Sequence, residues 1–164
     1  MKKLIYISLL LFFAKDVFAT IIHVGKEQNI KTIRQALLLA ADGDTVLVGS
    51  GQYHEQNILI NKSIALIGIN HPILDGDNKY EIISIKANAV TVEGFKLINS
   101  GVSSIEDFAG IKVYNGKDIV IRNNILENTF FGIYIQYGIN CLIENNNLTA
   151  YSKIEQESGN GIHC

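Results

Sequence analysis

Few side chains in this chain of 164 residues could hold a soft metal ion, and they are scattered along it. The candidates are two cysteines and four histidines: Cys141, Cys164, His23, His54, His71 and His163. The histidines share no short ligand spacing, and the one methionine is Met1. A tight site for a soft transition metal needs several such ligands converging on one point. The sequence therefore predicts at most a weak metal site, at His163 and Cys164.

Carboxylates in catalytic arrangements are equally scarce. Polysaccharide hydrolases need paired carboxylates at a suitable distance, and calcium-dependent lyases need a carboxylate cluster with an arginine that acts as a base. Asp75 and Asp77 lie close together in "LDGDN", but this string is typical of a turn. Arg34 falls in a predicted helix, which leaves Arg122. We therefore expect no catalytic group in this chain and no enzymatic activity.

The elements that must position these residues repeat along the chain. The string "VIRNN" at residues 120–124 returns as "LIENN" at residues 142–146, and such a period indicates stacked coils. Aligning "TVEGFKLINS", "VIRNNILENT" and "LIENNNLTAY" produces three aliphatic columns: Val92, Ile121 and Ile143; Leu97, Leu126 and Leu148; Val90, Ile119 and Cys141. Because side chains of a strand alternate between its two faces, these columns face one interior.

A second strand follows in each repeat, as "GIKVYNG", "GIYIQYG" and "GIHC". It adds two inward columns: Ile111, Ile133 and Ile162, and Val113, Ile135 and Cys164. Alternation then turns Lys112, Tyr134 and His163 outward. This outward column is either a binding stripe for a partner or a solvated strand face. Both cysteines fall in inward columns, where a free cysteine behaves as a small hydrophobic residue, so a disulfide is not expected.

Stacked coils of this kind form a right-handed single-stranded parallel β-helix, an all-β solenoid that rises about 4.8 Å per coil. Asn124 and Asn146 fall at one corner of it. Asparagine tolerates a left-handed backbone and can bond to the next coil, so we expect an asparagine ladder there. Arg122 shares a column with Glu93 and Glu144, which predicts an ion pair across coils.

A short helix is predicted before the coils, over about residues 30–42. "TIRQALLLAADGD" has apolar residues at helical spacing, and Gly43 stands where a C-terminal cap belongs. This helix would cover the exposed end of the stack. The first predicted strands are "TVLVGSGQY", "NILI", "SIALIGI" and "EIISI". The chain stops at Cys164 in mid strand, so we expect a C-terminally incomplete β-helix.

Two loops of similar size leave the same corner on alternate coils, after Leu97 and after Leu148. They carry four carboxylates: Glu106, Asp107, Glu155 and Glu157. The loops form either one acidic surface for a partner or two solvated, variable segments.

Residues 1–19 have the form of a secretory signal peptide, with two lysines, an apolar run and a cleavage position after Ala19. The mature domain would be residues 20–164, in the periplasm; the alternative is an uncleaved signal that tethers the chain. The apolar run is too short for a membrane span of about 20 residues, and no later segment reaches that length. The mature chain has no basic run, so nucleic acid is not expected as a partner.

The run "TIRQALLLAADGDTVLVGSGQYHEQNILINKSIALIGINHPILDG" resembles the N-terminal cap and first coils of periplasmic right-handed β-helix proteins. With its continuation through "VEGFKLINSG" to "GNGIHC", the chain is most similar to the NosD family, the periplasmic maturation factors of nitrous oxide reductase. The resemblance implies a non-enzymatic assembly factor that works with an ABC transporter on the copper site of the reductase. No cofactor follows from the residues themselves, and copper enters only through the resemblance.

Two other functions are compatible with the same motifs. The cap and the aliphatic–asparagine coils also occur in carbohydrate-active β-helix enzymes, which are polysaccharide lyases or hydrolases, and in structural surface proteins. The resemblance therefore favours the assembly factor and leaves these two alternatives open.

Overall fold

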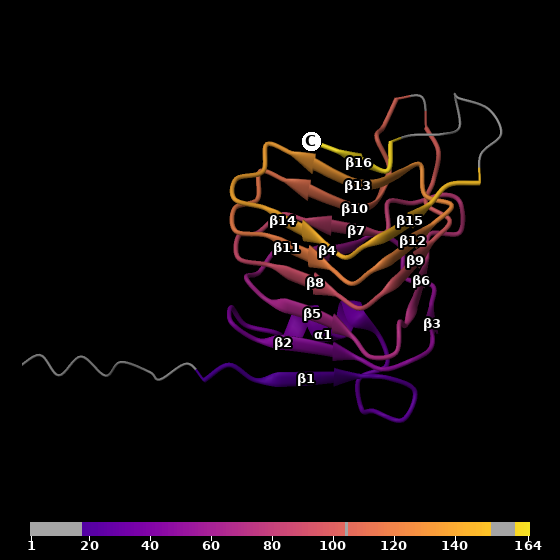
Figure 1. Cartoon of the computed structure of the whole chain (residues 1–164). Coiled ribbons are helices and arrows are strands. Elements are labelled where there is room, and N and C mark those ends of the chain that lie inside the picture. The colour runs from indigo at the N-terminus through magenta and orange to yellow at the C-terminus, as the bar shows by residue number, and fades with distance from the viewer. Residues whose placement is uncertain (1–17, 104, 152–159) are drawn as a thin grey trace, which may run out of the picture.

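The computed structural model describes residues 18–103, 105–151 and 160–164. Their strands form three sheets, and every pair of neighbouring strands is parallel. From β2 onward the chain visits the three sheets in turn, so each coil gives one strand to each sheet and the coils stack along one axis (Figure 1). The fold is the parallel β-helix that the sequence predicts.

Sheet A contains β1 (Ile21–Val24), β2 (Thr45–Val48), β5 (Ala65–Gly68), β8 (Thr91–Glu93), β11 (Val120–Arg122) and β14 (Leu142–Glu144). Sheet B contains β3 (Gln52–Tyr53), β6 (Ile73–Asp75), β9 (Lys96–Ile98), β12 (Ile125–Glu127) and β15 (Asn147–Thr149). Sheet C contains β4 (Ile58–Ile60), β7 (Ile83–Ile85), β10 (Ala109–Tyr114), β13 (Phe131–Gln136) and β16 (Ile162–His163). The sequence did not predict β1 or β6.

The register of the sheets confirms the predicted aliphatic columns. Val92 and Ile143 pair with Ile121 in sheet A, as Leu97 and Leu148 pair with Leu126 in sheet B. In sheet C, Ile111 and Ile162 pair with Ile133. The cysteines depart in part from the expected burial, because Cys141 is half-buried against the core and Cys164 is exposed.

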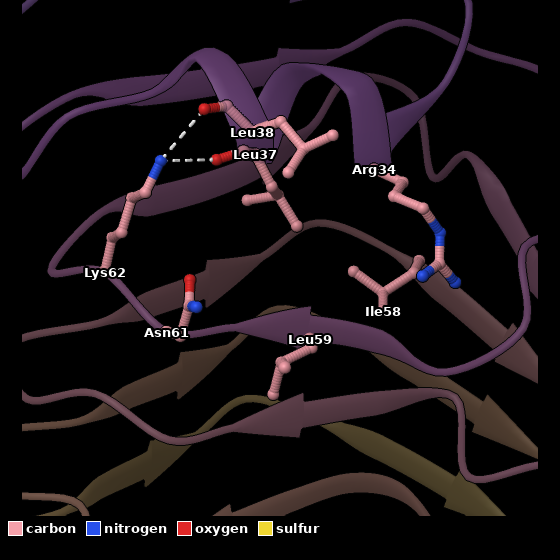
Figure 2. A pocket seen from close by; sticks show the side chains of 7 residues that line it. All are labelled: Arg34, Leu37, Leu38, Ile58, Leu59, Asn61 and Lys62. Atoms are coloured by element: carbon pink, nitrogen blue, oxygen red, sulfur yellow. Dashed lines mark hydrogen bonds between the residues drawn. The ribbon is translucent and has the colours of Figure 1, made fainter.

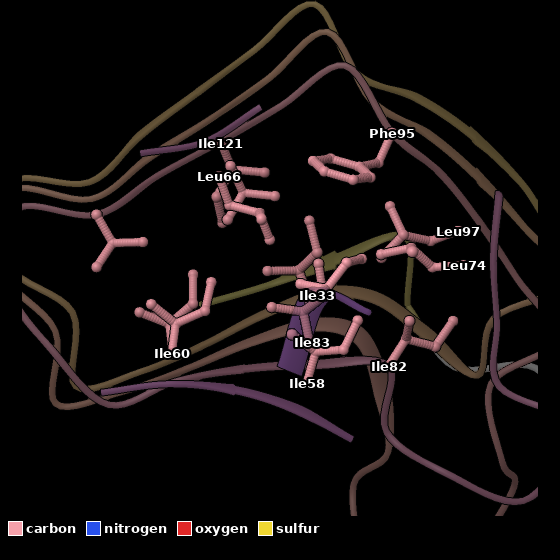
Figure 3. Packing of buried hydrophobic residues seen from close by; sticks show 14 of the residues in the cluster. Ile33, Ile58, Ile60, Leu66, Leu74, Ile82, Ile83, Phe95, Leu97 and Ile121 are labelled. Carbon is pink, nitrogen blue, oxygen red and sulfur yellow. The ribbon is translucent and has the colours of Figure 1, made fainter. Parts of the chain in front are cut away.

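The core fills the space between the three sheets. Isoleucine and leucine side chains point into this space from all three sides, and the fully buried Phe95 enters it from a corner (Figure 3). Burying one such side chain stabilises the fold by about 1.5–3 kcal/mol. Since each coil supplies several, the stack of coils holds itself together without a disulfide; both cysteines are free.

The helix α1 spans Ile33–Leu39, within the predicted range but shorter than it. It lies at the end of the stack, with Ile33 and Ala36 buried (Figure 1). Thr32 caps its N-terminus by accepting a hydrogen bond from the Gln35 amide (3.2 Å), and the Glu55 carboxylate accepts from the amides of residues 33 and 34. These contacts satisfy amides that would otherwise lack a partner.

The predicted cap at Gly43 is wrong, because the helix ends four residues earlier. Ala40 is the C-cap and has an extended backbone (φ −61°, ψ 148°). The Ala41 amide, which a longer helix would use internally, donates instead to the Asp44 carboxylate (2.7 Å). The left-handed Gly43 (φ 91°) serves the turn into β2.

Two residues make the corner from sheet A to sheet B in the later coils. The first has a left-handed backbone in Gly94, Asn123 and Asn145, with φ of 78°, 56° and 54°. The second position belongs to Phe95, Asn124 and Asn146. The prediction that Asn124 and Asn146 themselves adopt the left-handed conformation is therefore wrong by one residue.

No helix among the described residues is long and apolar enough to cross a membrane. The predicted signal segment falls almost entirely on residues 1–17, which lie outside the described part.

Candidate functional site

The register of sheet C aligns one outward-facing position of each successive strand into a column. Leu59, Ser84, Lys112, Tyr134 and His163 occupy equivalent positions in successive strands from β4 to β16. In β4, β7 and β10 the residues on either side of this column are buried aliphatics of the core. The predicted outward residues therefore lie side by side, and the column continues past them towards α1.

The upper part of this column is a stack of a cation and two rings. The Lys112 ammonium lies over the Tyr134 ring, 4.8 Å from its centroid. The imidazole of His163 lies parallel to the same ring, with 4.8 Å between centroids and 6° between planes. Phe131 packs beside both, at 5.3 and 5.6 Å. Because Lys112 and His163 occupy its two faces, Tyr134 presents its edge to solvent.

A buried carboxylate lies at the lower end of the stack. Glu81 is only 4% exposed. It accepts hydrogen bonds from the Ser84 hydroxyl and, at 3.2 Å, from the Tyr114 hydroxyl, while the Lys112 ammonium lies 4.0 Å away. The Ser84 hydroxyl also lies 2.6 Å from the side-chain oxygen of Asn57. These partners satisfy a group whose burial would otherwise be costly.

Burial raises the pKa of Glu81, although the hydrogen bond from Ser84 and the charge of Lys112 act in the opposite direction. A protonated Glu81 also fits the surrounding hydrogen bonds. It can donate to the Ser84 oxygen, which then donates to Asn57. Burial likewise raises the pKa of Tyr114, and the negative charge of Glu81 raises it further.

This cluster opens into a hollow of about 390 Å³ on the outer side of sheet C. Its lining consists of Asn57, Glu81, Ile105, Glu106, Asp107, Phe108, Lys112, Tyr114 and Gln136. Residues 105–108 belong to the loop between β9 and β10, and the Lys112 ammonium donates to the backbone carbonyl of Asp107 (3.0 Å). The loop carboxylates predicted to contact a partner thus face the predicted outward column.

A second, apolar hollow of about 200 Å³ lies between α1 and β4 at the cap end (Figure 2). Leu37, Leu38 and Leu59 line it, and Lys62 closes one side. The Lys62 ammonium donates to the carbonyls of Leu37 (2.9 Å) and Leu38 (3.1 Å). These carbonyls belong to the last turn of the helix, where a cation is stabilising, so Lys62 has a structural role.

The asparagine ladder joins three coils. The Asn124 side chain, 1% exposed, accepts from the Phe95 amide (3.0 Å) and donates to the Val92 carbonyl (3.1 Å) and to Oδ1 of Asn146 (3.0 Å). Asn146 in turn donates to the Ile121 carbonyl (2.9 Å). These bonds satisfy corner backbone groups, which assigns the ladder to structure.

The ion pair predicted across coils is also present. The guanidinium of Arg122 lies 2.8 Å from the Glu93 carboxylate and 3.8 Å from that of Glu144. The hydrogen bond from Arg122 lowers the pKa of Glu93. Arg122 is thereby engaged on sheet A, away from the hollow.

The residues predicted to hold copper do not suit that ion as they are placed. His163 and Cys164 are consecutive in an extended segment, where neighbouring side chains point in opposite directions. His163 stacks on Tyr134, and its Nδ1 lies 3.3 Å from the side-chain nitrogen Nδ2 of Asn160. Burial raises the pKa of Cys141, which disfavours its thiolate. Copper(I) prefers several soft ligands that converge. Among the described residues, no group of three ligand-type side chains includes His163, Cys164 or Cys141.

Within the described ranges, the one group of three ligand-type side chains is His54, Asp75 and Asp77, whose ligand atoms lie within 4.8 Å of one another. Nδ1 of His54 lies 3.0 Å from the Asp77 carboxylate. Asp75 accepts from the Asp77 amide (3.0 Å) and from Asn99 (3.1 Å). The hydrogen bonds of the turn explain why these three side chains lie together. Two of the three possible metal ligands are carboxylate oxygens, which copper(I) does not prefer. His23 lies in β1 and His71 in a turn; both are exposed.

Sequence reasoning missed Glu81, Ser84 and Tyr114. The segment "EIISI" is predicted as an early strand, but without alignment to the repeats its column positions stay unknown. Aligning Ile83 with Ile111 would have placed Ser84 beside Lys112 and found the lower half of the site. Two other predicted partner residues, Glu155 and Glu157, lie outside the described residues.

No family model matches the chain. Among curated proteins, a cell surface glycoprotein of Methanothermus fervidus is 36% identical over 98 residues, which are 59% of this chain and 15% of that protein. A protein named probable ABC transporter binding protein NosD, of Pseudomonas aeruginosa, is 30% identical over 130 residues, which are 77% of this chain and 30% of that protein. The chain therefore spans less than a third of the length of these relatives.

Among solved structures, the deglycosylated pectin methylesterase of Aspergillus niger aligns with a TM-score of 0.36 and 16% identity. The alignment covers 82% of this chain and 68% of that enzyme.

Proposed function

We propose that this chain is the β-helix binding module of an accessory protein that acts outside the cytoplasm, of the NosD type, and that it docks on a partner protein. The observation that carries the proposal is the outer face of sheet C. There a buried polar cluster, an open hollow and an exposed loop adjoin one another. Ile105 on that loop is 92% exposed and lines the hollow, so a docked partner would cover it.

The similarity to a NosD protein over 77% of this chain supports the accessory role. The names of the two relatives, a cell surface glycoprotein and an ABC transporter binding protein, support a location outside the cytoplasm. The finer form of the proposal is a periplasmic factor whose partner is an ABC transporter or nitrous oxide reductase, and which assists maturation of the copper site. The name of the relative supports the transporter, and the resemblance found in the sequence supports the reductase.

On this proposal the chain brings partners together and does not store metal. The poor convergence of His163 and Cys164 is then harmless, because docking uses the outer face of sheet C and its loop.

The test measures binding of the purified chain to the exported parts of a NosD-associated ABC transporter and to nitrous oxide reductase. Tyr134→Ala and Ile105→Ser alter the proposed face, and Thr149→Ala alters an exposed position of sheet B as the matched control. We expect each face variant to weaken binding about tenfold or more, and the control to bind like the wild type. Circular dichroism melts establish that the variants remain folded. Equal binding by all variants, or no binding to either protein, contradicts the proposal.

A carbohydrate-active enzyme is the second candidate, and one observation favours it. Burial raises the pKa of Glu81, which is the direction that a general acid needs, and Glu81 lines the hollow beside Tyr114 and Lys112. Glycoside hydrolysis canonically uses two carboxylates, so a second would have to come from Glu106 or Asp107. The Tyr134 ring, covered on both faces, is not free to stack on a sugar. Release of reducing or unsaturated sugars from a polysaccharide, abolished in Glu81→Gln, would establish the enzyme.

A further inference from the structure

The hollow beside sheet C is lined by more negative than positive charge. Three carboxylates line it, those of Glu81, Glu106 and Asp107, against the single ammonium of Lys112. Lys112 lies 4.0 Å from Glu81 and directs a hydrogen bond to a backbone carbonyl of the loop. In the described part of the chain, no cation forms an ion pair with the side chain of Glu106 or Asp107. Lys112 is thus paired with Glu81, and Lys86 adds a second positive charge beside Tyr114. The two loop carboxylates have no ion-pair partner among the described residues, so negative charge still exceeds positive charge.

The Tyr114 hydroxyl is exposed to this negative potential. After burial, the causes that raise its pKa are the charge and hydrogen bond of Glu81, followed by the charges of Glu106 and Asp107. All three carboxylates therefore act at one point in the hollow. The Tyr114 ring also attracts cations, since the ammonium groups of Lys86 and Lys112 lie 4.7 and 5.0 Å from its centroid.

The rim of the hollow is apolar on the loop side. Ile105 and Phe108 line the hollow from the loop, and Ile105 is 92% exposed. An apolar rim excludes water from a charged centre when a partner covers it, which strengthens the electrostatic attraction inside. The hollow and its rim therefore favour a partner surface with one protruding cation surrounded by apolar residues.

We infer that this hollow receives an arginine side chain of the partner protein. The inference rests on the proposed docking function and names the chemistry of the contact. A guanidinium offers five donors in a fixed plane, which suits the carboxylates of Glu106 and Asp107 together with the side-chain oxygens of Asn57 and Gln136. It is also more weakly hydrated than an ammonium, so it loses less on leaving water for the hollow. A lysine would bring a compact, strongly hydrated charge with only three donors.

The test titrates the full chain with a blocked arginine, N-acetyl-arginine amide, and follows backbone amide signals by NMR. N-acetyl-lysine amide and N-acetyl-glutamine amide serve as the cationic and neutral comparison probes. We expect the arginine probe to shift the amides of Tyr114 and Asp107, the lysine probe to bind more weakly, and the glutamine probe to have no effect. The double variant Glu106→Gln and Asp107→Asn should weaken the arginine probe about tenfold or more. Glu144→Gln, on sheet A, should leave its binding unchanged.

The inference is overturned if the arginine probe shifts no signal in the hollow, if the lysine or glutamine probe binds equally well, or if the double variant binds like the wild type. These substitutions lie on an exposed loop, so an effect of misfolding is not expected, and the amide spectrum of each variant verifies this. Failure of the inference is distinguishable from failure of docking. If Tyr134→Ala weakens partner binding while no blocked arginine binds, the proposed docking on sheet C is kept and the insertion of an arginine into the hollow is rejected.

Discussion

The side chain of Asn124 donates a hydrogen bond to Oδ1 of Asn146 in the next coil, at 3.0 Å, and the same oxygen accepts from the Asn124 backbone amide at 3.0 Å. One side-chain oxygen thus satisfies two donors of the coil before it. Asn124 repeats the pattern one coil earlier, where its oxygen accepts from the Phe95 amide. The backbone groups of this corner therefore depend on side chains supplied by a different coil.

Replacing Asn124 should destabilise the fold well beyond an ordinary surface substitution. Asn124→Ala leaves the buried Phe95 amide and Val92 carbonyl without their partner, and an unsatisfied buried group costs about 1–3 kcal/mol. Asn147→Ala is the matched control, because Asn147 directly follows the ladder residue Asn146 in the sequence but is exposed. Urea unfolding monitored by circular dichroism gives both values. Equal, small losses would mean that the ladder contributes nothing to stability.

The corner glycine Gly94 should not tolerate a side chain. A Cβ added there would lie 2.5 Å from the backbone oxygen of Gly68, and its φ is 78°. Gly43→Ala isolates the conformational part of the cost, since Gly43 has φ of 91° but no atom within 4 Å of an added Cβ. We expect about 1–2 kcal/mol for Gly43→Ala, and for Gly94→Ala a further 1–3 kcal/mol or so from the clash. Equal melting temperatures for the two variants would contradict this.

Stability should depend on pH through Glu81. Burial raises its pKa in the folded protein above the ordinary value of 4.5, so the folded state binds more protons than the unfolded state in this window. The contribution of Glu81 is therefore fully present below its unfolded pKa and is lost as pH rises through its folded pKa. In Glu81→Gln, the free energy of unfolding should lack this decline when urea unfolding is measured over a pH series. Glu144→Gln, on the outside of sheet A, should keep it. A variant that follows the wild-type curve would exclude Glu81 as its source.

Copper(I) should bind this chain weakly. The described residues form no group of three ligand-type side chains that includes His163, Cys164 or Cys141, so a strong chelator should remove the metal under reducing conditions. Any residual binding should disappear in His163→Ala or Cys164→Ser. A competition titration decides the matter: one equivalent of chelator-resistant copper on the folded protein would restore a direct metal role.

Export should remove residues 1–19 and leave Thr20 as the first residue. The Thr20 amide already donates to the Asp44 carboxylate at 2.7 Å, and this bond contributes to the lowered pKa of Asp44 after that from Ala41. Cleavage would turn this amide into an ammonium beside a carboxylate, a stronger contact. N-terminal sequencing of exported protein checks the position. Recovery of Lys2 in membrane-bound protein would favour a tether.

The repeated part of the fold was predictable because its columns follow from alternation alone. Once "VIRNN" and "LIENN" are aligned, the inward and outward sides of the later coils follow, including the outward position of Tyr134. The early coils lack the repeated string, and β6 follows a proline and runs into a turn sequence, so no pattern marked it. The helix boundary depended on Asp44, whose side chain accepts from the Ala41 amide three residues before it and so competes with continuation of the helix.

The candidate site was predictable where it coincided with the columns or with the loop after Leu97, which carries Glu106 and Asp107. Lys112 and His163 share the outward column, but Tyr114 lies two positions further along β10 and Glu81 lies just before β7. What joins them is the parallel register of β7 and β10 and the fold of the loop over them. Burial of Glu81 is likewise a property of the assembled coils, because nothing in "KYEIIS" distinguishes it from a solvated glutamate.

The corner from sheet B to sheet C has a consequence for how such a protein changes over generations. Between β9 and β10 the chain uses residues 99–108, whereas between β12 and β13 it uses only residues 128–130, yet the strands that follow are in register. A mutation at Gly94 or Asn124 disturbs neighbouring coils and is selected against, while an insertion at this other corner changes only what the protein touches. Descendants of one ancestral solenoid can therefore acquire new partners by loop exchange, with the frame inherited unchanged. The hollow beside Glu81 is lined by residues of both kinds, from the strands of the solenoid and from the loop at this corner.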